Sequence, residues 1–389
     1  MITSLLLWAS LHLLLPSTLS FQSPVSRHVL AHSCTTNNGC NLAAPDGDTA
    51  AEATPDIPFF ASWPKWLQHG IRDSGGVKIL VDTATRTLAA PIFYYDNPWC
   101  FPEFCRISGD EYPWLVSLMR IAGVIDKEKP DVHFSKEAYG DHYRQIAQVM
   151  INASVDESEE AAPLFIFLHG GAWASGFPTM YRLISMPFLE RNFRSVILGY
   201  RTYPEATIEG QMDDLCLAVD YFAEKYGESN SPVVLMGHSS GAHISMLAAL
   251  KGRLPTVDAF ISASGVYDLE NHIEHERRMG WDEISPMSGA NGFSLESLRK
   301  NSPSRLIETM PLDLPPVLLL HGGDDGVLLP KNSKCFHDQL QNTIMPGREK
   351  KQNVKLEIVE GVGHQEIVLD TCLGGMTQSK IVDWLEGVI

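Results

Sequence analysis

The chain has 389 residues, of which 44% are hydrophobic and 20% charged, a balance that suits one large globular domain plus extensions. Its formal net charge of −17 argues against nucleic-acid binding and against a polybasic membrane patch. Seven cysteines, an odd number, do not predict a disulfide framework in a chain of this length. Cys34 with Cys40 and Cys100 with Cys105 are close enough in sequence to pair, and the sequence does not decide whether either pair forms a disulfide.

The N-terminus has the features of a targeting segment. Met1–Leu15 is an almost continuous apolar run, too short for a comfortable membrane span, and polar residues follow it. We therefore expect a signal peptide over residues 1–20 and entry into the secretory pathway, for secretion or for the endoplasmic reticulum. Residues 21–57 are poor in aromatics and predict a disordered leader. Their hydroxyl-rich start also resembles the transit peptide of algae with complex plastids, so both destinations stay open.

An aromatic-rich stretch precedes the main domain. Residues 58–131 interleave tryptophan, tyrosine and phenylalanine with prolines, and Trp114–Ile125 has helical apolar spacing. We expect a helical N-terminal extension packed on the core. The alternative is a cap that lines an acyl or prenyl pocket, or that makes peripheral contact with a membrane surface.

From residue 132 to residue 389, strands and helices alternate. Val132–Ala138 and Gln145–Ile151 flank a turn and predict a hairpin at a sheet edge. Further strands are predicted by short apolar runs at Leu164–Leu168, Ser195–Tyr200, Val233–Met236, Val257–Ala263, Pro316–Leu320 and Val354–Val359. Helices are predicted over Gln211–Tyr226, from Gly241 onward, and over Thr377–Gly387. This order predicts an α/β domain with a mostly parallel central sheet flanked by helices.

A glycine-rich loop follows the strand at Leu164–Leu168. It reads His169-Gly170-Gly171-Ala172-Trp173. Glycines let backbone N–H groups approach a substrate closely, and such donors stabilise negative charge on a carbonyl oxygen under attack. We expect the amides of Gly171 and Ala172, together with that of Ser240, to form an oxyanion hole. Gly170 is included in this set because it shapes the loop, and His169 is expected to brace it.

The strongest motif is Gly237-His238-Ser239-Ser240-Gly241. A Gly-x-Ser-x-Gly sequence between a buried strand and a helix is the sharp turn that exposes a serine hydroxyl at the edge of a sheet. Ser239 is therefore the predicted nucleophile. The flanking His238 and His243 are predicted to pack in the turn and on a helix face. Farther back, Arg201 and Asp214 are predicted to form a structural brace rather than a substrate clamp.

Residues 269–311 interrupt the alternation with a mostly polar excursion, which we expect to be a lid or a substrate-side insertion. His272 and His275 lie there at a spacing of three residues, but no third ligand converges on them in the sequence. We therefore expect no metal site and no cofactor.

Two late strands end in the residues that a serine nucleophile needs. The first leads into the loop His321–Gly326, where Asp325 is preferred over Asp324 as the acid by its position. The last strand leads to His364, which is preferred as the base over other histidines such as His321. The order serine, acid, histidine is one of the known arrangements of a catalytic triad, in which imidazole takes the serine proton and later returns it.

These motifs resemble the α/β-hydrolase superfamily, and within it the esterases related to prenylcysteine methylesterase, kynurenine formamidase and feruloyl-esterase-like enzymes. The resemblance covers the catalytic domain, residues 132–389, and implies the α/β-hydrolase fold. It also implies that Ser239, Asp325 and His364 form the triad, and that the substrate is a small carboxylic ester such as a prenylcysteine methyl ester.

Two other functions stay open. The same machinery serves an amidase of the kynurenine formamidase type, and a hydrolase scaffold can also serve as a binding protein without catalysis. All three triad positions are filled here, which favours an enzyme.

Overall fold

The computed structural model describes Lys65, Gln68, His69 and Arg72 and residues 132–156, 162–227, 231–307, 314–343, 353–372 and 374–389. The predicted signal peptide, the leader, nearly all of the aromatic extension and the cysteine pairs Cys34/Cys40 and Cys100/Cys105 lie outside these residues. Among the described residues, no helix is both long and apolar enough to cross a membrane.

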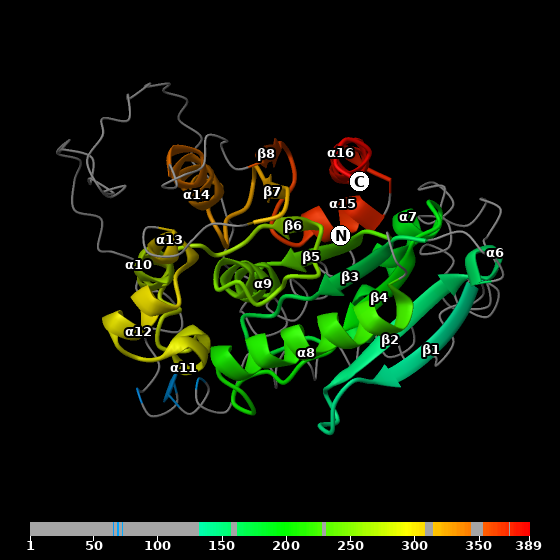
Figure 1. The fold of residues 1–389 in the computed structure, drawn as a ribbon. Coiled ribbons are helices and arrows are strands. Elements are labelled where there is room, and N and C mark those ends of the chain that lie inside the picture. Colours follow the sequence, from blue (N-terminus) through cyan, green and yellow to red (C-terminus); the bar gives the residue numbers. More distant parts are fainter. Residues whose placement is uncertain are drawn as a thin grey trace, which may run out of the picture.

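An eight-stranded sheet runs through the domain in the order β1-β2-β4-β3-β5-β6-β7-β8 (Figure 1). Strands β1 and β2 pair antiparallel, β2 pairs antiparallel with β4, and all other neighbours are parallel. The strands are β1 (Val132–Ala138), β2 (Ile146–Asn152), β3 (Leu164–Leu168), β4 (Arg194–Leu198), β5 (Val233–His238), β6 (Ala259–Ala263), β7 (Val317–Gly322) and β8 (Val354–Val359). The predicted edge hairpin and the mostly parallel sheet are both present.

The central strands are buried because helices cover both faces of the sheet. In β3 every residue is fully buried, and successive side chains alternate between the two faces. Leu164, Ile166 and Leu168 belong to one hydrophobic core, whereas Phe165 and Phe167 belong to the other. The continuous apolar run in the sequence therefore indicates a strand that contacts a hydrophobic core on each face of the sheet.

The helices divide between these two cores. One core is covered by α8 (Ile208–Tyr226), α9 (Ser240–Leu250) and α14 (Lys331–Asn342). The other is covered by the 3₁₀ helix η2 (Pro178–Ser185) and by α7 (Met186–Leu189), α15 (Glu366–Cys372) and α16 (Met376–Leu385). A short helix, α6 (Ala153–Asp156), follows β2.

The excursion after β6 is helical rather than irregular. It contains α10 (Leu269–Met279), α11 (Met287–Asn291), α12 (Leu295–Lys300) and α13 (Pro303–Leu306), grouped at one end of the sheet (Figure 1). The side chain of Asp268 caps α10 by accepting from the amide of Asn271, and Ser294 caps α12 in the same way. These polar caps explain why so hydrophilic a segment folds into helices.

Several element boundaries differ from the sequence prediction by one to three residues, and those of β4 and β5 flank the site. Strand β4 ends at Leu198, two residues earlier than predicted, and β5 continues to His238 instead of ending at Met236. The longer β5 leaves Ser239 alone between the strand and α9. The turn at the predicted nucleophile is therefore tighter than the glycine spacing alone indicated.

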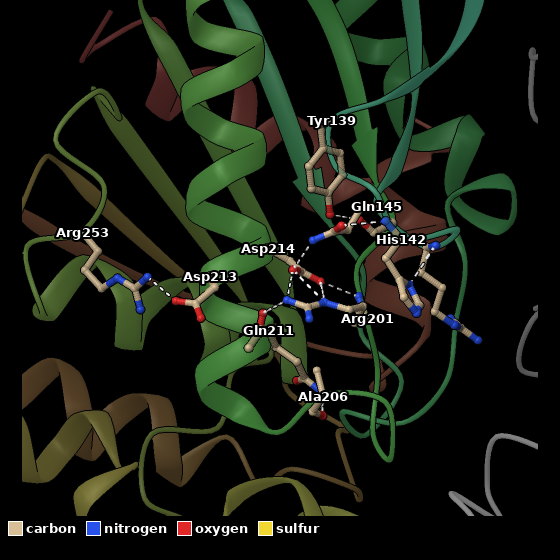
Figure 2. A network of polar contacts seen from close by, with 12 residues as sticks. Tyr139, His142, Gln145, Arg201, Ala206, Gln211, Asp213, Asp214 and Arg253 are labelled. Carbon is tan, nitrogen blue, oxygen red and sulfur yellow. Dashed lines mark hydrogen bonds and ion pairs between the residues drawn. The ribbon is translucent and has the colours of Figure 1, made fainter.

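A buried carboxylate ties the edge hairpin to the helical layer, as Figure 2 shows. Asp214 of α8 is completely buried. Its carboxylate accepts from Gln145 Nε2 at 2.7 Å, from the backbone N of Arg201 at 2.8 Å and from Arg201 Nη2 at 2.6 Å. Gln145 in turn accepts from the amide of His142. Arg201 and Asp214 thus form the structural brace that their positions predicted.

Replacing Asp214 by Asn should lower the free energy of unfolding by about 2–4 kcal/mol, because the guanidinium loses its buried partner. The neighbouring Asp213 supplies a matched control, since its side chain is 55% exposed and pairs with Arg253 at the surface. Asp213→Asn should change the free energy by about 0.5 kcal/mol or less. Urea unfolding followed by tryptophan fluorescence measures both, and equal effects would contradict the assigned role.

Candidate active site

Ser239 lies on a strained turn between β5 and α9. Its φ angle is +54°, in a region that side chains other than glycine rarely adopt. The flanking glycines are required by close packing: a Cβ on Gly237 would lie 2.7 Å from Cα of Ala242, and one on Gly241 would lie 2.3 Å from the carbonyl oxygen of Leu168. This geometry is that of the nucleophile turn predicted from the sequence.

Three loops at the carboxyl ends of β5, β7 and β8 bring the predicted triad together. Nε2 of His364 lies 3.0 Å from Oγ of Ser239, and Nδ1 of His364 lies 2.7 Å from Oδ2 of Asp325. Asp324, the alternative acid, has an exposed side chain, and its backbone N–H donates to the carbonyl of Val362. The arrangement allows a proton to pass from the serine hydroxyl to an imidazole that a carboxylate holds in place.

Asp325 is ionised despite its burial. Burial alone raises the pKa of its carboxyl group, but hydrogen bonds with His321 and His364 outweigh this effect and hold the pKa well below its usual range. Its other oxygen, Oδ1, accepts from the amides of Val327 at 3.0 Å and Leu328 at 2.8 Å. The negative charge that would stabilise a protonated His364 is therefore present.

The glycine-rich loop lies directly against the nucleophile. A Cβ on Gly170 would be 2.8 Å from Cβ of Ser239. The next residues take positive φ angles of +132° at Gly171 and +51° at Ala172. Among the described residues, the amides of Gly171, Ala172 and Ser240 have no hydrogen-bond acceptor within the protein. These donors lie in the same region as the nucleophile, as an oxyanion hole requires.

Trp173 anchors this loop on three sides. Its carbonyl oxygen accepts from Gln211 Nε2 and from the amide of Tyr203, both at 2.8 Å. Its indole Nε1 donates to Nδ1 of His243 at 3.0 Å, and Nε2 of His243 donates to the carbonyl of Asn301 at 2.7 Å. His243 lies buried on α9, as predicted, and its side chain additionally links the glycine-rich loop, α9 and the excursion.

The histidines beside the motifs also have defined partners. Nδ1 of His169 donates to the carbonyl of Gly170 at 2.7 Å, in agreement with its predicted bracing role. Nε2 of His238 donates to the backbone carbonyl of His364 at 3.0 Å, so the residue before the nucleophile holds the chain that carries the base. Sequence reasoning gave no indication of this contact, because it joins residues far apart in the chain.

Burial keeps these histidines neutral. It lowers the pKa of His169 and of His243 to about 4, and that of His238 to about 3. For His238, the nearby charge of a protonated His364 lowers the pKa further. The neutral form of His243 matters for its role, since protonation of Nδ1 would remove the acceptor of the Trp173 indole.

Within the described part of the chain, no three His, Cys, Asp or Glu side chains are grouped to hold a metal ion. The rings of His272 and His275 lie 6.3 Å apart in α10. Nε2 of His272 lies 3.4 Å from the carboxylate of Glu276 on the same helix.

Comparison with known proteins finds similarity to esterases in sequence and in fold. The BD-FAE family model matches residues 152–340, which include Ser239 and Asp325. A probable isoprenylcysteine alpha-carbonyl methylesterase of Arabidopsis thaliana is 27% identical in an alignment 257 residues long that covers 61% of this chain. The match spans 58% of the plant protein, so this chain corresponds to somewhat more than half of that relative's length.

Two further similarities bear on the fold and on the reaction. A kynurenine formamidase of Drosophila melanogaster is 23% identical over 67% of this chain and 83% of its own length. The crystal structure of esterase B from Lactobacillus rhamnosis superposes with a TM-score of 0.52 at 17% identity, covering 72% of this chain and 96% of the esterase. That likeness is one of fold.

A methyl group on Gly170 should disrupt the site without disturbing the core. Because its Cβ would meet Ser239, we expect Gly170→Ala to lower kcat/KM by about 100-fold. Gly326 is the control, since a Cβ there meets nothing within 4 Å. Gly326→Ala should stay within about twofold of the parent protein in assays of ester hydrolysis. Similar losses in the two variants would argue against the contact between loop and nucleophile.

The neutral histidines make stability depend on pH. Their folded-state pKa values lie below the ordinary 6.5, so the unfolded chain takes up protons that the folded chain rejects. Stability should therefore fall as the pH drops from about 6.5 to 4, by about 2 kcal/mol for each histidine at pH 5. Urea midpoints at pH 7 and pH 5 measure this loss. His243→Gln should reduce it by about a third, and a midpoint unaffected by pH would refute the prediction.

Proposed function

We propose that this chain, which has the fold of α/β-hydrolase esterases, hydrolyses carboxylic esters through an acyl-enzyme on Ser239. The observation that carries this proposal is the continuous hydrogen-bonded series from Ser239 through His364 to Asp325. The amides of the glycine-rich loop beside it supply the second requirement of acyl transfer.

The first half of the reaction follows from these contacts. His364 Nε2 takes the proton of Ser239 as Oγ attacks the acyl carbon, and the carbonyl electron pair moves onto the oxygen. The amides of Gly171, Ala172 and Ser240 then donate to that oxyanion, a contribution of about 3–4 kcal/mol for a single donor in other serine hydrolases. When the tetrahedral species collapses, the ester C–O bond breaks, His364 returns the proton to the leaving alkoxide, and the alcohol departs.

The second half repeats these steps with water. His364 removes a proton from a water molecule as its oxygen attacks the acyl carbon, and collapse releases the carboxylic acid and restores the Ser239 hydroxyl. Asp325 stays ionised throughout, keeps the proton of His364 on Nδ1 and stabilises the imidazolium.

The substrate class that we propose is a small ester with an apolar portion, such as an isoprenylcysteine methyl ester. The similarity to the plant methylesterases supports this choice. The acid loop also exposes two apolar side chains, Val327 and Leu329, which are 41% and 40% exposed on either side of buried Leu328. Apolar surface of this kind beside the triad acid suits a prenyl or acyl chain.

Hydrolysis of an N-formyl amide is the second candidate, and the similarity to the Drosophila formamidase favours it. The same triad would then return its proton to a leaving amine. Turnover of a short-chain ester, farnesylcysteine methyl ester and N-formylkynurenine under one set of conditions separates the two reactions. A higher kcat/KM for N-formylkynurenine than for both esters would replace the ester proposal.

Removal of the nucleophile tests the mechanism directly. Ser239→Ala should abolish labelling by a fluorophosphonate probe and lower kcat by at least about 10⁴-fold, because no acyl-enzyme can form. The adjacent acids give a matched pair. Asp325→Asn should lower kcat by about 10⁴-fold, whereas Asp324→Asn should have little effect. Unchanged unfolding midpoints would show that the variants are folded, and labelling of Ser239→Ala would exclude Ser239 as the nucleophile.

A further inference from the structure

A second histidine besides His364 contacts the triad acid. His321 is near the end of β7 and completely buried. Its Nε2 lies 2.7 Å from the carbonyl oxygen of Leu328 and 3.2 Å from Oδ2 of Asp325. Its Nδ1 lies 2.6 Å from Oγ of Ser333. A carbonyl oxygen can only accept, so Nε2 carries a proton, which it shares between Leu328 and Asp325.

His321 completes the coordination of the carboxylate. An ionised carboxylate offers about four lone-pair positions. On Asp325, two backbone amides of its own loop donate to Oδ1, while His364 and His321 contact Oδ2. Because these contacts hold both oxygens, rotation of the carboxylate is restricted. One lone-pair position of Oδ2 is then left for His364.

We propose that His321 is a positioning residue for acyl transfer, which aims Oδ2 of Asp325 at His364 and shares the negative charge of that oxygen. This inference rests on the proposed function, since it assigns a role in the same site. His321 does not contact the reacting atoms and acts through the acid.

The consequence for catalysis has a definite direction. Without the His321 donor, the charge on Oδ2 is directed at His364 alone, and the carboxylate holds a proton on His364 more tightly. The unprotonated base that activates Ser239 then persists only at higher pH. The acid limb of the kcat/KM profile should therefore move toward higher pH, and kcat should fall because the carboxylate is aimed less well.

The other ionisable groups around the pair remain in the chain when His321 is replaced. They are His238 at the end of β5, His275 of α10 on the carbonyl of Gly326, Glu360 and Glu366 around the His364 loop, and Tyr267 beside Ser333. Burial raises the pKa of Tyr267 to about 12, so this phenol stays neutral across the profile. A displaced acid limb would therefore report the loss of His321.

Two amide substitutions test the proposal as a matched pair. In His321→Gln the side-chain nitrogen can reach the position of Nε2 and donate to Asp325, whereas in His321→Asn it reaches only the position of Nδ1, toward Ser333. For His321→Asn we expect kcat/KM to fall about 10- to 100-fold with little change in KM, and the acid limb to move up by about 0.5–1 pH unit. His321→Gln should keep the parent limb and most of the activity.

Ser333→Ala is the packing control. It removes the hydroxyl beside Nδ1 and leaves the contact between His321 and Asp325 in place, so its acid limb should match that of the parent. A limb displaced in Ser333→Ala as far as in His321→Asn would assign the effect to packing and overturn the proposal. Identical limbs in the Asn and Gln variants would overturn it as well.

A readout without turnover separates this inference from the proposed function. The proton on Nδ1 of His364, bonded to Asp325, should give a downfield proton NMR resonance that changes as His364 is protonated. The pH midpoint of that change should move upward in His321→Asn and stay in place in His321→Gln. Absence of fluorophosphonate labelling in the parent would refute the esterase proposal. An identical NMR midpoint in all three proteins would refute the role of His321.

Discussion

A carboxylate removed from water stays ionised only where other donors replace its hydration, and the environment of Asp325 meets this requirement. Backbone amides hold one of its oxygens, and two histidines contact the other. The loop that carries His364 passes so close to the end of β7 that a Cβ on Gly322 would lie 2.3 Å from the carbonyl of Val362. Asp325 thus fixes the position of His364, and His364 in turn contacts the hydroxyl of Ser239.

The rest of the fold supports this arrangement by keeping loop ends on rigid elements. Parallel strands end at one edge of the sheet, and two hydrophobic cores prevent the strands from shifting relative to one another. Contacts of backbone against backbone, such as Gly241 on the carbonyl of Leu168, then set the distance between the nucleophile turn and the glycine-rich loop. The side chains of Ser239, Asp325 and His364 are held in place by packing and hydrogen bonds, as a precise active site requires.

Much of this could be predicted from the sequence, because the information is local. The apolar runs of the strands, the Gly-x-Ser-x-Gly turn and the glycine-rich loop each specify a backbone shape within a few residues. The choice of Asp325 over Asp324 also follows from position in one loop. The short helices η2 and α7 were not predicted, since Pro178–Leu189 mixes polar and apolar residues without a clear period.

Contacts between distant residues could not be predicted in this way. The sequence places His238 and His243 beside their motifs, but their partners are 126 positions away for His238 and 58 or 70 for His243. Each of these rings exchanges hydrogen bonds to water for bonds to a carbonyl or an indole, and only the folded chain brings those groups near. The strongest motifs therefore pointed to the proposed reacting groups, while the residues that orient them became visible in three dimensions.

The bond from His243 to the carbonyl of Asn301 has a consequence for protein engineering. Under the proposed function, the helical excursion is the segment to exchange when a different ester preference is wanted. Its turn at Asn301, however, shares a histidine with the indole that anchors the amide donors. A transplanted segment that omits this turn would alter chemical rate along with selectivity, so successful chimeras should retain the backbone from Asn301 to Ser302 and exchange the helices before it.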